Sequence, residues 1–271
     1  MYMAKKQVPL SVRYFTALSY LVMVAVNAAA VLLPINGIPT GKISDMYPNL
    51  FAPAGITFSI WGVIYLLLAG YALYQLGIWQ EESNYPHIPM LTRISVLFSL
   101  SSIANAAWIF AWHYLNIPLA MVLMLVILIS LNSISGTIKK VHLDLKEKIF
   151  VYLPFSIYYG WISVATIANG VVLAVSLGLK GTGSEAVIWT VVLLAVVALL
   201  GSVVIISNRN IIYGLVLLWA YAGILVKHTS PDGFAGDYPA IINAAAVCIA
   251  VVVIAGIYSV LRARQGSSQR I

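Results

Sequence analysis

Long apolar runs recur from one end of this chain to the other, each close to twenty residues in length. A helix of about 20 apolar residues spans a hydrocarbon core of ~30 Å, whereas the strands of a membrane β-barrel would alternate in polarity. Of the 271 residues 62% are apolar and only 8% are charged, which is not the composition of a water-soluble domain. The sequence therefore predicts an all-α, polytopic membrane helix bundle.

Eight runs are long enough to cross a membrane. The first follows basic residues, as a signal peptide would, but it exceeds the apolar length of about 7–15 residues found there. The fifth would be ~45 Å long at ~1.5 Å per residue, so we expect it to end or break near Asn169-Gly170. The predicted helices are Tyr14–Leu33, Phe58–Trp79, Ile94–His113, Ile117–Ile138, Ile149–Gly178, Ala186–Ile206, Ile211–Val226 and Ala240–Leu261.

The distribution of basic residues supports this count. If the N-terminus lies inside, 12 of the 15 Lys and Arg residues fall on the cytoplasmic side, and only Lys42, Lys180 and Lys227 fall outside. Because cytoplasmic loops collect Lys and Arg, we expect a multi-pass protein of the cell membrane with both termini cytoplasmic. A seven-helix alternative would merge Ala186–Val226 and bury Arg209 in the membrane, which is costly.

Several classes of function are disfavoured by missing residues. No Asp, Glu, Lys or Arg lies in the middle of a predicted helix, as an ion-coupled pump would usually need. The four histidines are scattered, and Cys248 is the only cysteine, so we expect neither a metal site nor a disulfide. No phosphate loop or nucleophile elbow is present, so we expect no enzyme and no required cofactor. The net charge of +7 is explained by the inside loops, so no nucleic-acid partner is expected.

Amide and aromatic side chains share helix faces, because residues three or four apart lie on one face. With the predicted topology these faces meet in the middle-to-outer half of the membrane, beneath the loop Pro34–Thr57. This loop is rich in Pro and Gly, with Asp45 and Asn49 as turn-forming residues, so we expect an ordered lid. The convergence predicts one pocket for a flat, largely apolar ligand. The residues that converge are Asn27, Trp61, Tyr65, Asn105, Trp108, Trp161 and Asn169.

A structural interpretation of the same residues stays open. Asn and Ser side chains bond across membrane helices at about 0.6 kcal/mol each without any ligand. Trp and Tyr residues also gather in belts at membrane interfaces, which is sufficient explanation for Trp79, Trp189 and Tyr258.

Three motifs, in the expected order and on the expected helices, resemble the tryptophan-rich sensory protein, or translocator protein (TspO/MBR), family. They are Trp61 with Tyr65 four residues on, Asn105-Ala-Ala-Trp108, and Trp161-Ile-Ser-Val-Ala-Thr-Ile-Ala-Asn169. The resemblance covers roughly Tyr14–Gly178 and implies a five-helix membrane core over residues 1–178, often dimeric. Residues 179–271 would add about three transmembrane helices and a short basic tail.

The resemblance also implies a function. It points to a sensor, receptor or carrier that binds a porphyrin, or another hydrophobic or tetrapyrrole-like ligand, beneath the first loop. The alternative is a permease for a small neutral solute, working by facilitated diffusion. Expected partners are membrane lipid, the small hydrophobic ligand and a second copy of the chain. The ligand-binding residues would be Asn27, Phe58, Trp61, Tyr65, Asn105, Trp108, Trp161, Ala165 and Asn169.

Overall fold

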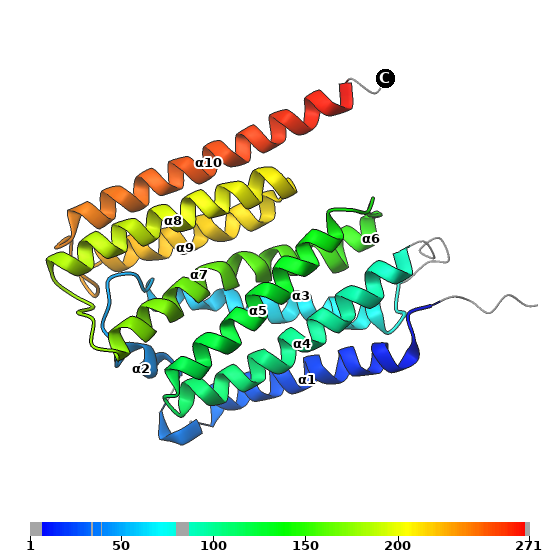
Figure 1. Ribbon diagram of the computed structural model, residues 1–271, viewed down its shortest axis with the longest axis horizontal. Helices are drawn as coiled ribbons and strands as arrows, with labels where there is room; N and C mark the ends of the chain where they lie inside the picture. Colours follow the sequence, from blue (N-terminus) through cyan, green and yellow to red (C-terminus); the bar gives the residue numbers. More distant parts are fainter. Residues whose placement is uncertain (1–6, 34, 39, 80–86, 269–271) are drawn as a thin grey trace, which may run out of the picture. The chain divides into compact units, whose positions relative to one another are not determined.

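The computed structural model describes residues 7–33, 35–38, 40–79 and 87–268, and the secondary structure of these residues is entirely helical (Figure 1). Eight helical segments among them are long and apolar enough to cross a membrane, as the sequence predicts. The long helices are α1 (Leu10–Leu32), α3 (Ile60–Gln75), α4 (Ile88–His113), α5 (Ile117–Ile138), α7 (Leu153–Ser176), α8 (Ser184–Asn208), α9 (Ile211–Thr229) and α10 (Pro239–Ser268). The short elements are η1 (Ile35–Gly37), α2 (Thr40–Asp45), η2 (Gly55–Ser59), α6 (Leu145–Glu147) and η4 (Lys148–Tyr152).

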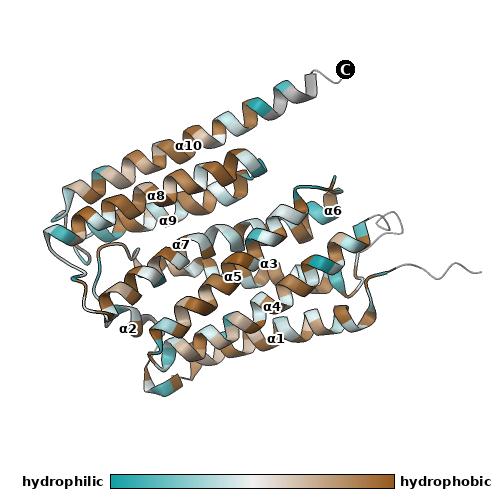
Figure 2. Ribbon diagram, viewed as in Figure 1, coloured by the Kyte–Doolittle hydropathy of each residue, from teal (hydrophilic) through white to brown (hydrophobic). Residues whose placement is uncertain are grey.

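Hydropathy follows the helices closely. Apolar residues run along the long helices, and hydrophilic residues gather at helix ends and in the connections (Figure 2). Many large apolar side chains are exposed on these helices, among them Leu66, Leu199 and Ile254. Exposed apolar side chains on long apolar helices are what a lipid environment requires.

Helix α3 differs from its predicted bounds at both ends. It begins at Ile60, and Phe58 lies in the preceding 3₁₀ turn η2 instead of on the helix. It ends at Gln75 and does not reach Trp79. The early end has a local cause, because Gly77 (φ 98°) and Trp79 (φ 65°) both adopt left-handed backbone that an α-helix cannot continue through.

The expected break near Asn169-Gly170 is wrong, because α7 continues through these residues to Ser176. The irregularity lies at the other end of the segment, where η4 is a π-helical turn directly before α7. Pro154 explains it, since proline has no N–H to donate and its ring displaces the carbonyl four residues earlier. The apolar segment Leu145–Ser176 is therefore 32 residues long and helical throughout, with a change of helical register at the π-helical turn.

The separation of α8 from α9 confirms eight helices over the seven-helix alternative. Arg209 ends α8 in left-handed conformation, with φ 51° and ψ 39°. The side chain of Asn210 then caps α9 by accepting a hydrogen bond from the Tyr213 N–H at 3.0 Å. Arg209 therefore lies between two helices and is not buried inside one.

The chain divides into two compact units. Unit 1 comprises Met1–Thr40 and Gly62–Tyr159, and unit 2 comprises Gly41–Trp61 and Gly160–Ile271. In unit 1, α4 packs against both α1 and α5. In unit 2, α8, α9 and α10 pack against one another, and η2 packs against α9 (Figure 1).

Candidate ligand-binding site

The predicted ligand-binding residues are divided between the two units. Unit 1 holds Asn27, Tyr65, Asn105 and Trp108. Unit 2 holds Phe58, Trp61, Trp161, Ala165 and Asn169. The single pocket lined by both sets stays a prediction.

Three aromatic residues of unit 2 form a cluster around Trp161, which we call the Trp161 cluster: Phe58, Trp61 and Trp161. The ring centroid of Trp161 lies 5.7 Å from that of Phe58 and 6.2 Å from that of Trp61, with interplanar angles of 89° and 87°. These edge-to-face arrangements are favourable, because the positive edge of one ring meets the negative face of another. Trp161 is only 2% exposed, whereas Phe58 is 43% exposed. Trp161 is therefore the buried member of the cluster, and Phe58 forms its exposed side.

The indole N–H of Trp161 is the unusual feature of this cluster. It is buried and, among the residues described, has no hydrogen-bond partner. Buried tryptophan N–H groups normally find an acceptor, and an unsatisfied one costs about 1–3 kcal/mol. One N–H donor among aromatic rings is suited to a largely apolar ligand that carries one hydrogen-bond acceptor.

Ala165 and Asn169 follow Trp161 at four-residue steps along α7. Asn169 is 6% exposed, and its Nδ2 donates to the Ala165 carbonyl at 3.3 Å. Thr166 likewise donates to the Ile162 carbonyl at 2.7 Å. These polar side chains bond back to their own helix, which lets α7 carry them inside an apolar environment.

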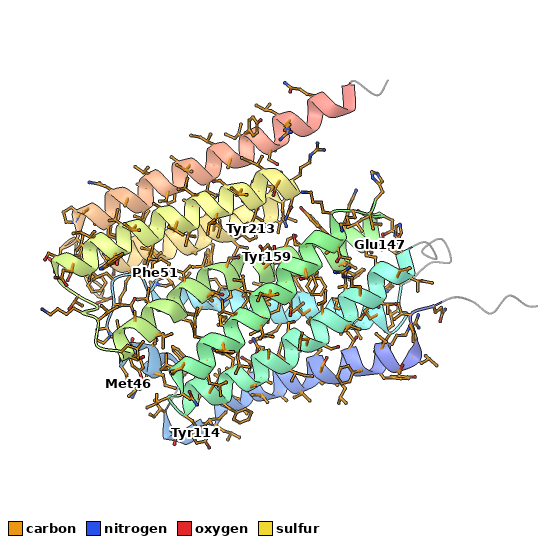
Figure 3. The ribbon with its side chains drawn as sticks, viewed as in Figure 1. Met46, Phe51, Tyr114, Glu147, Tyr159 and Tyr213 are labelled. Atoms are coloured by element: carbon orange, nitrogen blue, oxygen red, sulfur yellow. The ribbon has the colours of Figure 1, made fainter. Side chains whose placement is uncertain are left out.

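The segment that leads to the cluster is built from turns. Asn49 Oδ1 accepts from the N–H groups of Phe51 (3.1 Å) and Ala52 (2.9 Å), which confirms its predicted role as a turn former. Phe51, labelled in Figure 3, is 1% exposed, as is Leu50. The residues described between 40 and 57 are therefore folded and partly buried, while the lid function expected for this loop stays a prediction.

In unit 1, the predicted site residues Asn27 and Asn105 are bonded to each other. Asn27 Nδ2 donates to Asn105 Oδ1 at 2.7 Å and to the Met23 carbonyl at 2.8 Å. Asn105 is 1% exposed, and its Nδ2 donates to the Tyr158 hydroxyl at 3.4 Å. Side-chain bonds of this kind join membrane helices directly, here α1 and α4, which favours the structural interpretation for this pair.

The other two predicted residues of unit 1 also have protein neighbours. Trp108 stacks on Trp112, with ring centroids 5.3 Å apart and planes at 21°. The carbonyl of Tyr65 accepts from the Tyr20 hydroxyl at 2.9 Å. The first contact lies within α4, and the second joins α1 to α3.

Sequence reasoning missed the role of His113, which is fully buried. Its Nδ1 lies 3.0 Å from the Ile35 carbonyl, and its Nε2 lies 2.9 Å from the Thr40 hydroxyl. Because a carbonyl only accepts, Nδ1 carries the proton in the neutral ring and Nε2 accepts from Thr40. The histidine therefore fixes the segment after α1 against the end of α4.

Glu147 is a second residue that sequence reasoning missed (Figure 3). Although it is a carboxylate, it is 0% exposed. Its Oε1 lies 2.7 Å from His87 Nδ1, and it forms a capping box with Asp144 through bonds of 2.7 Å and 3.1 Å. The Asp-x-x-Glu spacing was the available signal, since it is a known start of a helix.

Unit 1 also contains a buried polar row that the predicted site did not include. Gln75 Nε2 donates to the Tyr71 hydroxyl at 3.2 Å, which lies 3.1 Å from Ser95 Oγ. Gln75 Oε1, Ser99 Oγ and Ser102 Oγ are buried and, within the described residues, have no hydrogen-bond partner. The steps of four and three from Ser95 to Ser99 to Ser102 place these serines on one face of α4.

No group of three or more His, Cys, Asp or Glu side chains that could hold a metal ion occurs in the described part of the chain. The predicted site residues themselves offer aromatic rings, the indole N–H of Trp161 and the amides of three asparagines.

Eight helices of membrane length in the described part of the chain define a multi-pass integral membrane protein. A sequence model described as TSPO-like protein matches residues 13–258, and the chain belongs to this TSPO-like family. The matched range includes the helices that follow residue 178, and the predicted boundary there stays a prediction. Comparison with curated proteins and with solved structures gives no match.

Proposed function

We propose that this chain is a non-enzymatic membrane receptor or carrier for a hydrophobic, tetrapyrrole-like ligand, held at the Trp161 cluster of unit 2. The proposal rests on one observation, the buried indole N–H of Trp161, which has no hydrogen-bond partner in the described part of the chain. A ligand acceptor would satisfy this donor, while the ring faces of Phe58 and Trp61 would cover an apolar ring system. The ligand class is therefore flat, mostly apolar, and equipped with a carbonyl, carboxylate or ring nitrogen.

Membership of the TSPO-like family supports a multi-pass, non-enzymatic membrane protein. The bilayer is the first partner of such a chain, and a second copy is the protein partner that the family resemblance implies. Phe58 offers the entry side, since it is the exposed member of the cluster.

Fluorescence of the purified protein tests the proposal. Protoporphyrin IX is titrated into the protein in lipid nanodiscs, and tryptophan quenching is followed. We expect saturable quenching with one site per chain, competed by flat apolar compounds with an acceptor and not by matched hydrocarbons. Quenching that rises linearly without saturation for every compound would overturn the proposal.

One observation favours the permease as a second candidate. The buried row of Gln75, Ser99 and Ser102 offers polar atoms that have no partner among the described residues of unit 1, and a small neutral solute or ordered waters could bond to them. Uptake of such solutes into proteoliposomes decides between the functions. A permease gives saturable uptake that Ser99→Ala with Ser102→Ala reduces, whereas a receptor gives none.

A further inference from the structure

We propose that α9 is a clamp that holds the segment Gly41–Trp61 in place, so that Trp219, Gly223 and His228 are positioning residues for the Trp161 cluster. All of these residues belong to unit 2. The effect on ligand binding rests on the proposed function, whereas the clamp itself does not. The proposal gives α9 a role at the Trp161 cluster.

Two of the contacts hold the start and the middle of η2. The N–H of Ala54 donates to the Gly223 carbonyl at 3.0 Å. The indole N–H of Trp219 donates to the Thr57 carbonyl at 2.9 Å. Because both acceptors and one donor are backbone groups, these bonds fix the path of the chain and not only its side chains.

Close packing accompanies these bonds. A Cβ built on Gly223 would lie 2.7 Å from Thr57 Cγ2 and 2.9 Å from Thr57 Cβ, so the helix surface has room for Thr57 only because residue 223 is glycine. Thr57 is correspondingly 1% exposed. Within a membrane the hydrophobic effect does not drive helices together, so close contacts of this kind are a main source of packing energy.

A third bond holds the segment further upstream. His228, fully buried at the end of α9, donates from Nε2 to the Leu50 carbonyl at 2.9 Å. Its ring is supported by Phe234 and Tyr238, with centroids 4.8 Å and 5.8 Å away. Residues of the loop after α9 thus hold the imidazole in place, and its hydrogen bond in turn fixes the position of the Leu50 carbonyl.

The clamp reaches the Trp161 cluster through a short length of backbone. Phe58 directly follows Thr57, and Trp61 stands three residues further on. Fixing the Thr57 carbonyl therefore fixes the start of the turn that carries both rings to Trp161. If the segment moves on α9, the edge-to-face contacts of Phe58 and Trp61 with Trp161 should change.

Two variants and two matched controls test the clamp. Gly223→Ala introduces the clash with Thr57, and Trp219→Phe removes the bond to the Thr57 carbonyl while it keeps an aromatic ring. Gly256→Ala is the control for the first, because a Cβ there meets nothing within 4 Å. Trp189→Phe, at a position 65% exposed on α8, is the control for the second.

Amide hydrogen exchange in nanodiscs, without ligand, is the deciding measurement. We expect exchange in residues 50–61 to be about fivefold faster in Gly223→Ala and Trp219→Phe, the factor for losing one ordinary hydrogen bond, and unchanged in the controls. The ¹⁹F resonances of Trp61 and Trp161 in 5-fluorotryptophan-labelled Gly223→Ala should also shift. If Gly223→Ala does not fold, Trp219→Phe, which leaves the packing volume nearly intact, carries the test.

Unchanged exchange in Trp219→Phe would overturn the clamp, and faster exchange with unmoved ¹⁹F resonances would overturn the positioning of the cluster. Affinity for protoporphyrin IX should fall about fivefold in the two variants, the same factor for the same lost bond. If the unmodified protein does not bind the porphyrin, the proposed function fails, while the exchange and ¹⁹F results still decide the clamp.

Discussion

The rings of Trp61 and Trp161 meet edge to face, with centroids 6.2 Å apart and planes at 87°. Trp61 stands at the start of α3 and Trp161 on α7, one hundred residues later in the chain. This contact brings together two of the motifs that carry the family resemblance. The Trp161 N–H has no protein acceptor among the described residues, and this donor is the basis of the proposed function.

The first prediction concerns orientation in the membrane. With 12 basic residues on one side and 3 on the other, we expect both termini in the cytoplasm. A reporter that is active only in the cytoplasm, fused after Ile271, should be active, and the same reporter inserted within Ser230–Asp237 should be silent. The reverse pattern would contradict the assigned topology.

The Asn27–Asn105 pair should contribute to stability. Asn105→Leu removes the partner of the Asn27 amide and the donor to Tyr158, so we expect the free energy of unfolding to fall by about 1–3 kcal/mol. In a double-mutant cycle with Asn27→Ala, the coupling should be about 0.6 kcal/mol, typical of side-chain bonds between membrane helices. Strictly additive losses, measured by thermal unfolding in detergent, would show that the 2.7 Å bond contributes nothing.

Gly160 should be intolerant of a larger residue. A Cβ there would lie 2.8 Å from Val216 Cβ and 3.1 Å from the Tyr213 carbonyl oxygen, both on α9. Overpacking of about 1–3 kcal/mol should outweigh the gain in helix propensity, which is at most about 1 kcal/mol. Gly160→Ala should therefore melt at a lower temperature than Gly136→Ala, whose added Cβ meets nothing within 4 Å. Partial rescue by Val216→Ala would assign the loss to this contact, and equal melting of the two glycine variants would refute it.

The helices could be predicted from sequence because their signals are local. Apolar length sets each span, and Asn116 as a cap places the start of α5 at Ile117, as predicted. The break at Arg209 was likewise predictable from the cost of burying its charge. The start of α3 was not, since a 3₁₀ turn and an α-helix present nearly the same residues on one face over one turn.

Partners far apart in the chain could not be predicted from spacing. Trp219 and Thr57 are 162 residues apart, and His228 and Leu50 are 178 apart, so no periodicity relates them. From the sequence alone, Asn27, Asn105 and Trp161 are all predicted to be ligand-binding residues. Only their neighbours distinguish them, because the two amides bond to each other, whereas no acceptor for the indole N–H occurs among the residues that the structure describes.

The central claim is tested most directly by replacing Trp161 with phenylalanine, which keeps an aromatic ring and removes the indole N–H. Protoporphyrin IX affinity per folded molecule and melting temperature are measured together, with Trp189→Phe as the control. We expect affinity to fall about five- to tenfold, for one lost hydrogen bond and a smaller ring, while the melting temperature stays within a few degrees. A lowered melting temperature with unchanged affinity would mean that Trp161 only packs the helices, and would contradict the proposed site.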